Sequence, residues 1–240
     1  MQLSRRVFLQ TAGSITAAIV SGVLPHAVRA AQSDKPRIGI IGSGRIGGTL
    51  GGIWVKGGHD VMFSSLDIEQ DKALAAKLGG GARAGTTPEA VAFGDVLLLA
   101  VPYTAFPGLS KELAAAMKGK IVIDASNPIV NRDGEVAAAA REKGAGLAAA
   151  EYFPGARIVR AFNAIGYAKL PEFAGKPGTG MPMAADDQKA YAVAADLVRE
   201  VGLEPVLVGP LSMGKHLVPG TPLGGEHSPE EIRKIAATLK

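Results

Sequence analysis

The sequence predicts a doubly wound α/β fold, in which helices cover both faces of a mostly parallel sheet within one extended domain. Two observations support this prediction. From residue 35 onward, short β-rich runs alternate with helical stretches, which is the order of β-α-β units. Residues 96–101 are all apolar, which is typical of a strand buried on both faces.

The first half of the chain contains five predicted strands joined by helices. Gly57 and Gly58 end the first helix, and Pro88 lies in the first turn of the third, where proline is well tolerated. The predicted strands are residues 37–41, 61–63, 82–85, 95–101 and 121–124, and the helices are residues 45–56, 68–78, a brief one from 87, and 104–117.

The same alternation continues beyond residue 124. Further strands are predicted at residues 157–162, 181–184 and 205–208, with a well-patterned helix at residues 187–200 between the last two. A Gly- and Pro-rich tail begins at about residue 212. Because no linker and no repeat interrupts the pattern, residues 31–240 are predicted to form a single domain.

Residues 1–30 have the features of a twin-arginine export signal. Ser4-Arg5-Arg6-Val7-Phe8-Leu9 is followed by an apolar stretch at residues 12–24, and Val28-Arg29-Ala30 provides small residues for cleavage. The alternative is an uncleaved membrane anchor, but about 13 apolar residues are fewer than the ~20 that span a bilayer. We therefore expect a periplasmic protein with no stable membrane span after cleavage.

Charge and composition exclude several classes of function. The first 30 residues hold three arginines and no acid, and removing these from the 26 basic residues leaves 23 against 22 acidic ones. This balance gives no reason to expect a nucleic-acid partner. The chain has no cysteine, which excludes disulfides, thiolate metal sites and cysteine nucleophiles. No spacing of His, Asp and Glu suggests a metal site.

The strongest chemical signal is Gly42-Ser43-Gly44-Arg45-Ile46-Gly47, which fits the pattern G-x-G-x-x-G. It directly follows a predicted strand and opens a helix, which is the context of a dinucleotide-binding turn. Gly42 permits the tight turn, Gly44 lets a diphosphate approach the backbone, and Gly47 lets the helix pack on the strand. The helix amides then face the phosphates. The sequence thus predicts a Rossmann-type site, and a glycine-rich turn without a ligand is the alternative.

The end of the second strand bears on the choice of nucleotide. NAD-specific sites place Asp or Glu there to bind the ribose 2′-hydroxyl, whereas this chain reads Phe63-Ser64-Ser65-Leu66. Ser64 and Ser65 could donate to a 2′-phosphate, and Arg45 could add positive charge, which favours NADP(H). Alternatively, both serines cap the following helix.

Two further strand ends are expected to border the nicotinamide, because ligands of open α/β sheets lie beyond the carboxyl ends of the strands. Ala100, Val101 and Pro102 close the fourth strand, and Asn127 and Pro128 follow the fifth. Asn127 can bond the ribose or the carboxamide, or it can satisfy its own turn. Tyr103 is the one candidate proton donor near this edge, and Asp124 is expected to bond a neighbouring loop rather than to act in catalysis.

Several motifs together resemble the coenzyme F420-dependent NADP oxidoreductase family over residues 36–212. They are residues 42–47, 63–65, 99–103, 124–128, 154–163 and 182–187. The resemblance implies direct hydride transfer between NADPH and a deazaflavin, and it implies that Phe162, Asn163, Ala164 and Ile165 border the second-substrate pocket. Phe162 by itself is expected to belong to the core rather than to that pocket. Related domains are the NADPH-binding part of membrane ferric reductases. Leu66 stands where the family commonly has an arginine that clamps the 2′-phosphate.

The predicted function is an NAD(P)H-dependent oxidoreductase that transfers hydride between NADP(H) and a deazaflavin- or flavin-type acceptor. Such an exchange needs proximity and orientation more than proton transfer, so no catalytic residue is assigned. The alternatives are an NADPH-dependent ferric or quinone reductase and a non-catalytic dinucleotide-binding sensor. The oligomeric state stays open, with a homodimer as one alternative.

Overall fold

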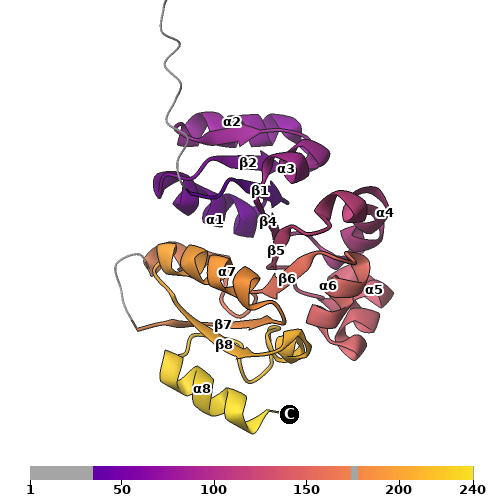
Figure 1. Ribbon diagram of the computed structural model, residues 1–240, viewed down its shortest axis with the longest axis vertical. Helices are drawn as coiled ribbons and strands as arrows, with labels where there is room; N and C mark the ends of the chain where they lie inside the picture. The colour runs from indigo at the N-terminus through magenta and orange to yellow at the C-terminus, as the bar shows by residue number, and fades with distance from the viewer. Residues whose placement is uncertain (1–34, 174–177, 240) are drawn as a thin grey trace, which may run out of the picture. The chain divides into compact units, whose positions relative to one another are not determined.

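Eight strands make up one sheet in the computed structural model, which describes residues 35–173 and 178–239. They are β1 (Ile38–Ile41), β2 (Val61–Ser64), β3 (Ala82–Ala84), β4 (Val96–Leu99), β5 (Ile121–Asp124), β6 (Arg157–Arg160), β7 (Gly180–Ala185) and β8 (Glu204–Gly209). Their order is β3-β2-β1-β4-β5-β6-β7-β8, and every pairing is parallel except that of β6 with β7 (Figure 1). The predicted doubly wound, mostly parallel sheet is confirmed.

Helices connect these strands. They are α1 (Arg45–Lys56), α2 (Ile68–Leu78), α3 (Thr87–Phe93), α4 (Phe106–Met117), α5 (Val130–Lys143), α6 (Ala145–Tyr152), α7 (Gln188–Glu200) and α8 (Pro229–Thr238). Three short 3₁₀ segments add to them: η1 (Tyr103–Ala105), η2 (Tyr167–Glu172) and η3 (Leu211–His216). Among the described residues no helix combines the length and apolarity needed to cross a bilayer. The export signal predicted at residues 1–30 lies outside the described residues.

Two apolar layers hold the helices against the sheet. One layer joins α1 and α7 to the strands, and the Trp54 indole N–H in this layer donates to Leu197 O at 3.1 Å. The other layer packs α3, α4 and α6 on the opposite face around Leu97, Phe106 and Phe153. Burial on both faces explains why β4 is apolar at every position.

The sheet reverses its direction of growth between β1 and β4. The chain moves outward from β1 to β3, crosses back with α3, and continues from β4 on the other side of β1. Ile41 pairs with Leu99, so the carboxyl ends of the two strands lie side by side. In doubly wound sheets this switch point forms the ligand crevice.

The prediction missed three helices. Helix α5 contains Gly134 at φ 57, which breaks its helical periodicity, and α6 is largely alanine and therefore weakly amphipathic. Helix α8 lies in the segment that was predicted as a tail. Its capping box of Ser228 and Glu231, with Pro229 in the first turn, is a recognisable start signal that was overlooked.

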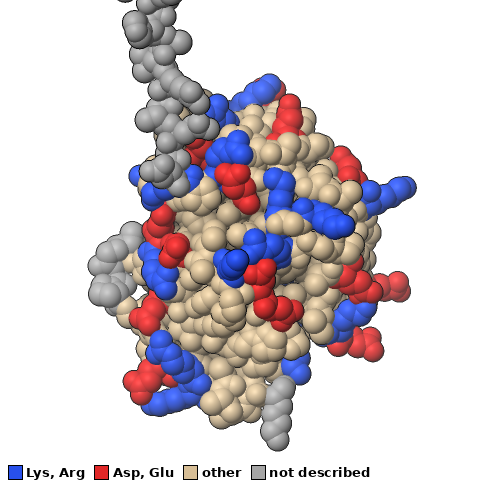
Figure 2. All heavy atoms as spheres, viewed as in Figure 1, with Lys and Arg blue, Asp and Glu red and all other residues tan. Residues whose placement is uncertain are grey.

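Charged side chains are interspersed on the face drawn in Figure 2. Lysine and arginine alternate there with acidic residues, and no patch of a single sign dominates this face. Exposed ion pairs among the described residues include that of Arg37 with Asp95. This face therefore has no basic stripe of the kind that binds nucleic acid.

The contact between β1 and α3 depends on the missing side chain of Gly39. A methyl group there would overlap the carbonyl oxygen of Ala90. We expect Gly39→Ala to lower the free energy of unfolding by about 1–3 kcal/mol, as overpacking of a rigid contact does. Urea denaturation, monitored by circular dichroism, measures this free energy.

Gly52→Ala in α1 is the matched control. Its added methyl group would meet only the flexible side chain of Leu78, at 3.4 Å, and alanine favours a helix more than glycine does. We expect this variant to be as stable as the parent or slightly more stable. Equal destabilisation by both variants would contradict the close contact at Gly39.

Candidate functional site

The three glycines of the turn between β1 and α1 have three different surroundings. Gly42 has φ 95, and a side chain there would strike the carbonyl of Ala100. A side chain at Gly47 would overlap Gly42 O, so its absence lets α1 lie against the turn. Nothing lies within 4 Å of the position that a Cβ of Gly44 would take. This open space above the backbone fits the predicted approach of a diphosphate.

Some backbone amides of this turn bond to the protein, and others are available to a ligand. Gly42 N and Ser43 N both donate to Ser64 O, at 2.9 and 3.1 Å, which ties the turn to the end of β2. Gly44 caps α1 without a side-chain hydrogen bond, and the first turn of α1 has no acidic residue. Because the first amides of a helix lack intrahelical acceptors, this terminus can receive an anion.

A cleft of about 370 Å³ opens at the carboxyl ends of β1 and β4. Six predicted cofactor residues line it, namely Gly42, Gly44, Ser65, Ala100, Val101 and Pro102. The other lining residues are Ile41, Leu66, Asp67, Gln70, Thr87, Ala105 and Leu109. The cleft therefore begins at the glycine turn and reaches both the end of β2 and the end of β4.

The predicted role of Ser64 is wrong. Its side chain is fully buried, and its hydroxyl donates to Ile40 O at 2.6 Å, so it does not face the cleft. The alternative, in which both serines cap the next helix, is wrong as well. Asp67 caps α2, with Oδ1 accepting from Glu69 N and Gln70 N at 3.1 and 3.0 Å.

Ser65 lines the cleft, but its hydroxyl is engaged with a buried carboxylate. It donates to Asp71 Oδ2 at 2.9 Å, and Ser43 donates to the other oxygen of the same carboxylate. Asp71 is fully buried beside the turn. Ser43 consequently contributes its backbone to the turn, while its side chain points inward.

Arg45 does not line the cleft near Ser65, where positive charge was predicted. Its guanidinium carbon lies 5.4 Å from the ring centroid of Tyr167 in η2, and this segment packs against α1. The cation–π contact keeps Arg45 on the side of the turn that faces η2. Its predicted neighbour Ile46 packs against the apolar layer under α1.

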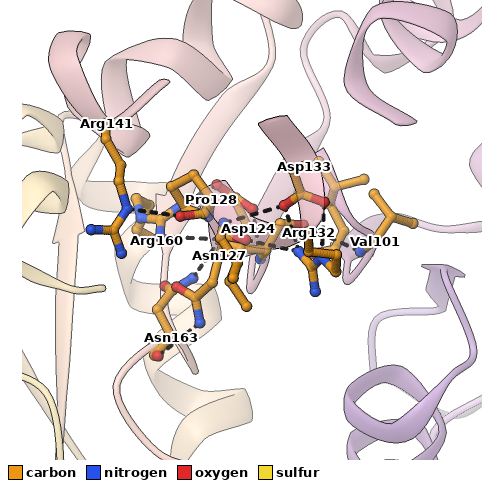
Figure 3. A network of polar contacts seen from close by, with 12 residues as sticks. Val101, Asp124, Asn127, Pro128, Arg132, Asp133, Arg141, Arg160 and Asn163 are labelled. Carbon is orange, nitrogen blue, oxygen red and sulfur yellow. Dashed lines mark hydrogen bonds and ion pairs between the residues drawn. The ribbon is translucent and has the colours of Figure 1, made fainter. Parts of the chain in front are cut away.

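The loops after β4, β5 and β6 are joined by a polar network (Figure 3). Val101 N donates to Ser126 Oγ at 3.2 Å, and Ser126 O accepts from Asn163 Nδ2 at 3.1 Å. Asn127 Nδ2 donates to Asn163 O at 3.0 Å. The amide oxygens of Asn127 and Asn163 are buried and have no hydrogen-bond partner among the described residues. Both are therefore buried acceptors whose hydrogen-bonding capacity the described part of the chain leaves unused.

A buried ion pair supports this network from below. Arg160 and Asp124 are both fully buried and approach to 2.5 Å, and Arg160 also donates to Ser126 O at 3.1 Å. Asp124 accepts from Ser126 N at 2.9 Å. Asp124 thus bonds the neighbouring loop, as the sequence analysis expected.

Two arginines hold the outer side of the same loop. Arg141 Nε donates to Pro128 O at 2.8 Å, which fixes the predicted Pro128 in place. Arg132 donates to Asn127 O at 3.0 Å and pairs with Asp133. The Arg132 guanidinium lowers the pKa of Asp133 below its usual value.

Tyr103 is not available as a proton donor to the cleft. Its ring is fully buried and stacks on Phe106 at 4.1 Å between centroids, and its hydroxyl donates to Ala145 O at 3.0 Å. Burial also raises the pKa of Tyr103. In the described part of the chain, no group of three or more His, Asp or Glu side chains is arranged to hold a metal ion.

Phe162 belongs to the core rather than to the wall of a pocket. It is buried edge-on to Trp54, with ring centroids 6.0 Å apart. Its φ of 64 is the single positive value for a residue other than glycine among those described, and such strain tends to occur at functional loops. Here it turns the chain after β6 so that Asn163 reaches Ser126.

Comparisons with known proteins point to one family. Residues 37–128 match the model described as NADP oxidoreductase, coenzyme F420-dependent. The F420-dependent NADP reductase of Methanothermobacter thermautotrophicus is 28% identical over 179 residues, which cover 69% of this chain and 77% of that protein. Metalloreductase STEAP3 of Rattus norvegicus is 26% identical over 184 residues, which cover 77% of this chain and only 36% of that protein.

Solved structures agree with the fold. A hypothetical protein from Sinorhizobium meliloti superimposes with a TM-score of 0.69 at 25% identity, covering 80% of this chain and 95% of that one. A structure titled as a putative F420-dependent NADP reductase from Arthrobacter gives a TM-score of 0.61 at 18% identity, covering 75% and 87%. The resemblance predicted from the sequence is confirmed.

Gly44 provides the direct test of the diphosphate site. Gly44→Val should abolish nucleotide binding, because the side chain would fill the open space above the turn, and Gly44→Ala should weaken it less. Gly44→Ala should unfold at the parent temperature, since its added Cβ has no neighbouring atom within 4 Å, and the unfolding temperature of Gly44→Val shows whether that variant is folded. Isothermal titration calorimetry with NADPH, with thermal unfolding alongside, measures this. Undiminished affinity in Gly44→Val would place the phosphates elsewhere.

The buried pair beneath the network generates a stability prediction. Asp124→Asn should lower the free energy of unfolding by about 3–5 kcal/mol, because it leaves the charge of Arg160 buried without a counterion. Asp187→Asn is the control. It breaks a half-buried pair with Arg157 that stays in contact with solvent, and it keeps a good helix cap, so a much smaller loss is expected in chemical denaturation.

Proposed function

We propose that this chain, an NADP-dependent oxidoreductase that belongs to the F420-dependent NADP oxidoreductase family through residues 37–128, transfers hydride between NADP(H) and a deazaflavin- or flavin-type ring. The observation that carries the proposal is the course of the cleft. It runs from an open helix N-terminus at Gly44 to the end of β4, beside a loop network with two unsatisfied amide oxygens.

Each part of this edge suits one part of a dinucleotide. Gly44 and the first turn of α1 would hold the diphosphate. Ser65, Leu66 and Thr87 would border the adenosine, and Ala100, Val101 and Pro102 would border the nicotinamide ribose. Asn127 and Asn163 would accept hydrogen bonds from the carboxamide or from the second substrate. When bound, the nicotinamide supplies or receives the hydride.

The side chains that line the cleft support a ring-type acceptor. No lysine, histidine or tyrosine lines the cleft in the described part of the chain, and Tyr103 is buried with its hydroxyl bonded to Ala145 O. Reduction of a ketone or imine usually requires a positioned acid. Hydride exchange between two cofactor rings depends on their alignment, which a rigid strand edge can provide.

The similarity to a metalloreductase supports a second candidate, a reductase of ferric or quinone acceptors. The chain matches about a third of that protein, so this candidate concerns the hydride donor half of such a reaction. A sensor that binds the nucleotide without turnover is the non-catalytic alternative.

The export signal predicted at residues 1–30 adds the proposal that the folded protein functions in the periplasm. Protein purified from the periplasm can be analysed for a bound nicotinamide nucleotide.

Stopped-flow oxidation of NADPH distinguishes these candidates. We expect multiple turnovers with a deazaflavin or flavin acceptor, at least tenfold faster than with ferric or quinone acceptors. Fastest turnover with ferric or quinone acceptors would favour the second candidate. Nucleotide binding without turnover by any acceptor would indicate the sensor. Gly44→Val serves as the control, because it removes turnover in every catalytic case.

A further inference from the structure

We infer that the adenosine end of this cleft is built for a ribose 2′-hydroxyl, with Asp67 as its acceptor, so that NADH binds at least as tightly as NADPH. The inference rests on the proposed function, because it concerns the same cleft. It addresses the ratio of the two affinities, whereas the diphosphate and nicotinamide contacts are common to both nucleotides.

Asp67 has the position and the free acceptor that this role needs. It follows the last glycine of the turn, Gly47, by 20 residues, and it lines the cleft next to Ser65 and Leu66. Dinucleotide sites that bind the 2′-hydroxyl place an acid at about this spacing. Both helix-capping bonds of Asp67 go to Oδ1, and Oδ2 has no protein partner among the described residues. A carboxylate accepts hydrogen bonds and does not donate them, so it suits a hydroxyl.

Among the described residues, the same end of the cleft has no cationic donor for a 2′-phosphate, and its neutral donors are Gln70 and Thr87. Ser64 is buried, and the Ser65 proton is directed to Asp71. None of the described residues that line the cleft is a lysine or an arginine. Leu66, at the lip, is fully exposed and uncharged. The nearest residue of the turn with a positive charge, Arg45, is stacked on Tyr167.

Negative charge gathers at this end. Asp71 is fully buried between two serine hydroxyls and is not paired with a cation among the described residues. Glu69 and Asp71 also occupy the first turn of α2, whose amides are already capped by Asp67. A phosphate dianion placed here would face carboxylates, whereas a hydroxyl would face acceptors. The N-terminus of α1, without acids, differs in this respect.

The test is the pair of dissociation constants for NADPH and NADH, measured by calorimetry on the purified full chain. We expect the constant for NADPH to equal or exceed that for NADH. NADPH binding ten times more tightly than NADH would overturn the inference and leave the proposed function intact. Binding of neither nucleotide would overturn both.

Three variants assign the effect to Asp67. Asp67→Asn keeps a residue that caps helices well and removes the charge. It should weaken the binding of NADH and strengthen the binding of NADPH. The ratio of the two dissociation constants should shift by about tenfold, because a neutral acceptor binds a hydroxyl less strongly than a charged one does. Leu66→Arg should strengthen NADPH by about tenfold with NADH unchanged.

Glu69→Gln is the matched control. It removes a charge from the same helical turn, but Glu69 is exposed, pairs with Lys72 and does not line the cleft. Its ratio of constants should stay within twofold of the parent value. Equal shifts in Asp67→Asn and Glu69→Gln would show a general charge effect and would overturn the role of Asp67, as would an equal change of both nucleotides in Asp67→Asn.

Discussion

One carbonyl oxygen, Ser64 O, holds the turn on which the cleft depends. It accepts the amides of Gly42 and Ser43, and the turn reaches it because Gly42 and Gly47 have no side chains at their closest approaches. The ends of β1 and β2 are thereby joined, and Ala100 N, which donates to Ile41 O at 2.9 Å, adds the end of β4 to the same edge. The amides of Gly42 and Ser43 are engaged in this turn. The first amides of α1 have no intrahelical acceptor and are available to a ligand. The proposed diphosphate site therefore depends on backbone geometry rather than on charged side chains.

On the other side of the switch point, a buried ion pair holds the loops after β4, β5 and β6 together. The buried pair of Arg160 and Asp124 fixes Ser126, and Ser126 fixes both Val101 and Asn163. Burying two charges is costly, and the hydrogen bonds that Arg160 and Asp124 make with Ser126 offset part of that cost, although the Nε of Arg160 has no partner among the described residues. The strained backbone at Phe162 fits this arrangement, because it turns the β6 loop onto the same point. Three loops distant in sequence thus share one network (Figure 3).

Sequence patterns predicted the sheet and the glycine turn because both depend on short-range features. Apolar periodicity identified the strands, and the glycine spacing identified the turn. The roles of Ser64 and Arg45 were wrong because they depend on distant partners, Ile40 O and Tyr167. The alternative for the serines failed because Asp67 caps α2 and was not considered. The antiparallel pairing of β6 with β7 likewise depends on tertiary contacts, and no local sequence pattern specifies it.

The two helix N-termini at the cleft differ in their charge. This difference distinguishes the two ends of the cleft. Helix α1 begins with glycine, without a capping side chain or an acid, so its partial positive charge is exposed. Helix α2 begins with Asp67 and has two more acids in its first turn, so its positive end is already neutralised. In the proposed complex the anionic diphosphate would therefore lie over the start of α1, and the neutral, hydroxyl-bearing adenosine end would lie toward α2.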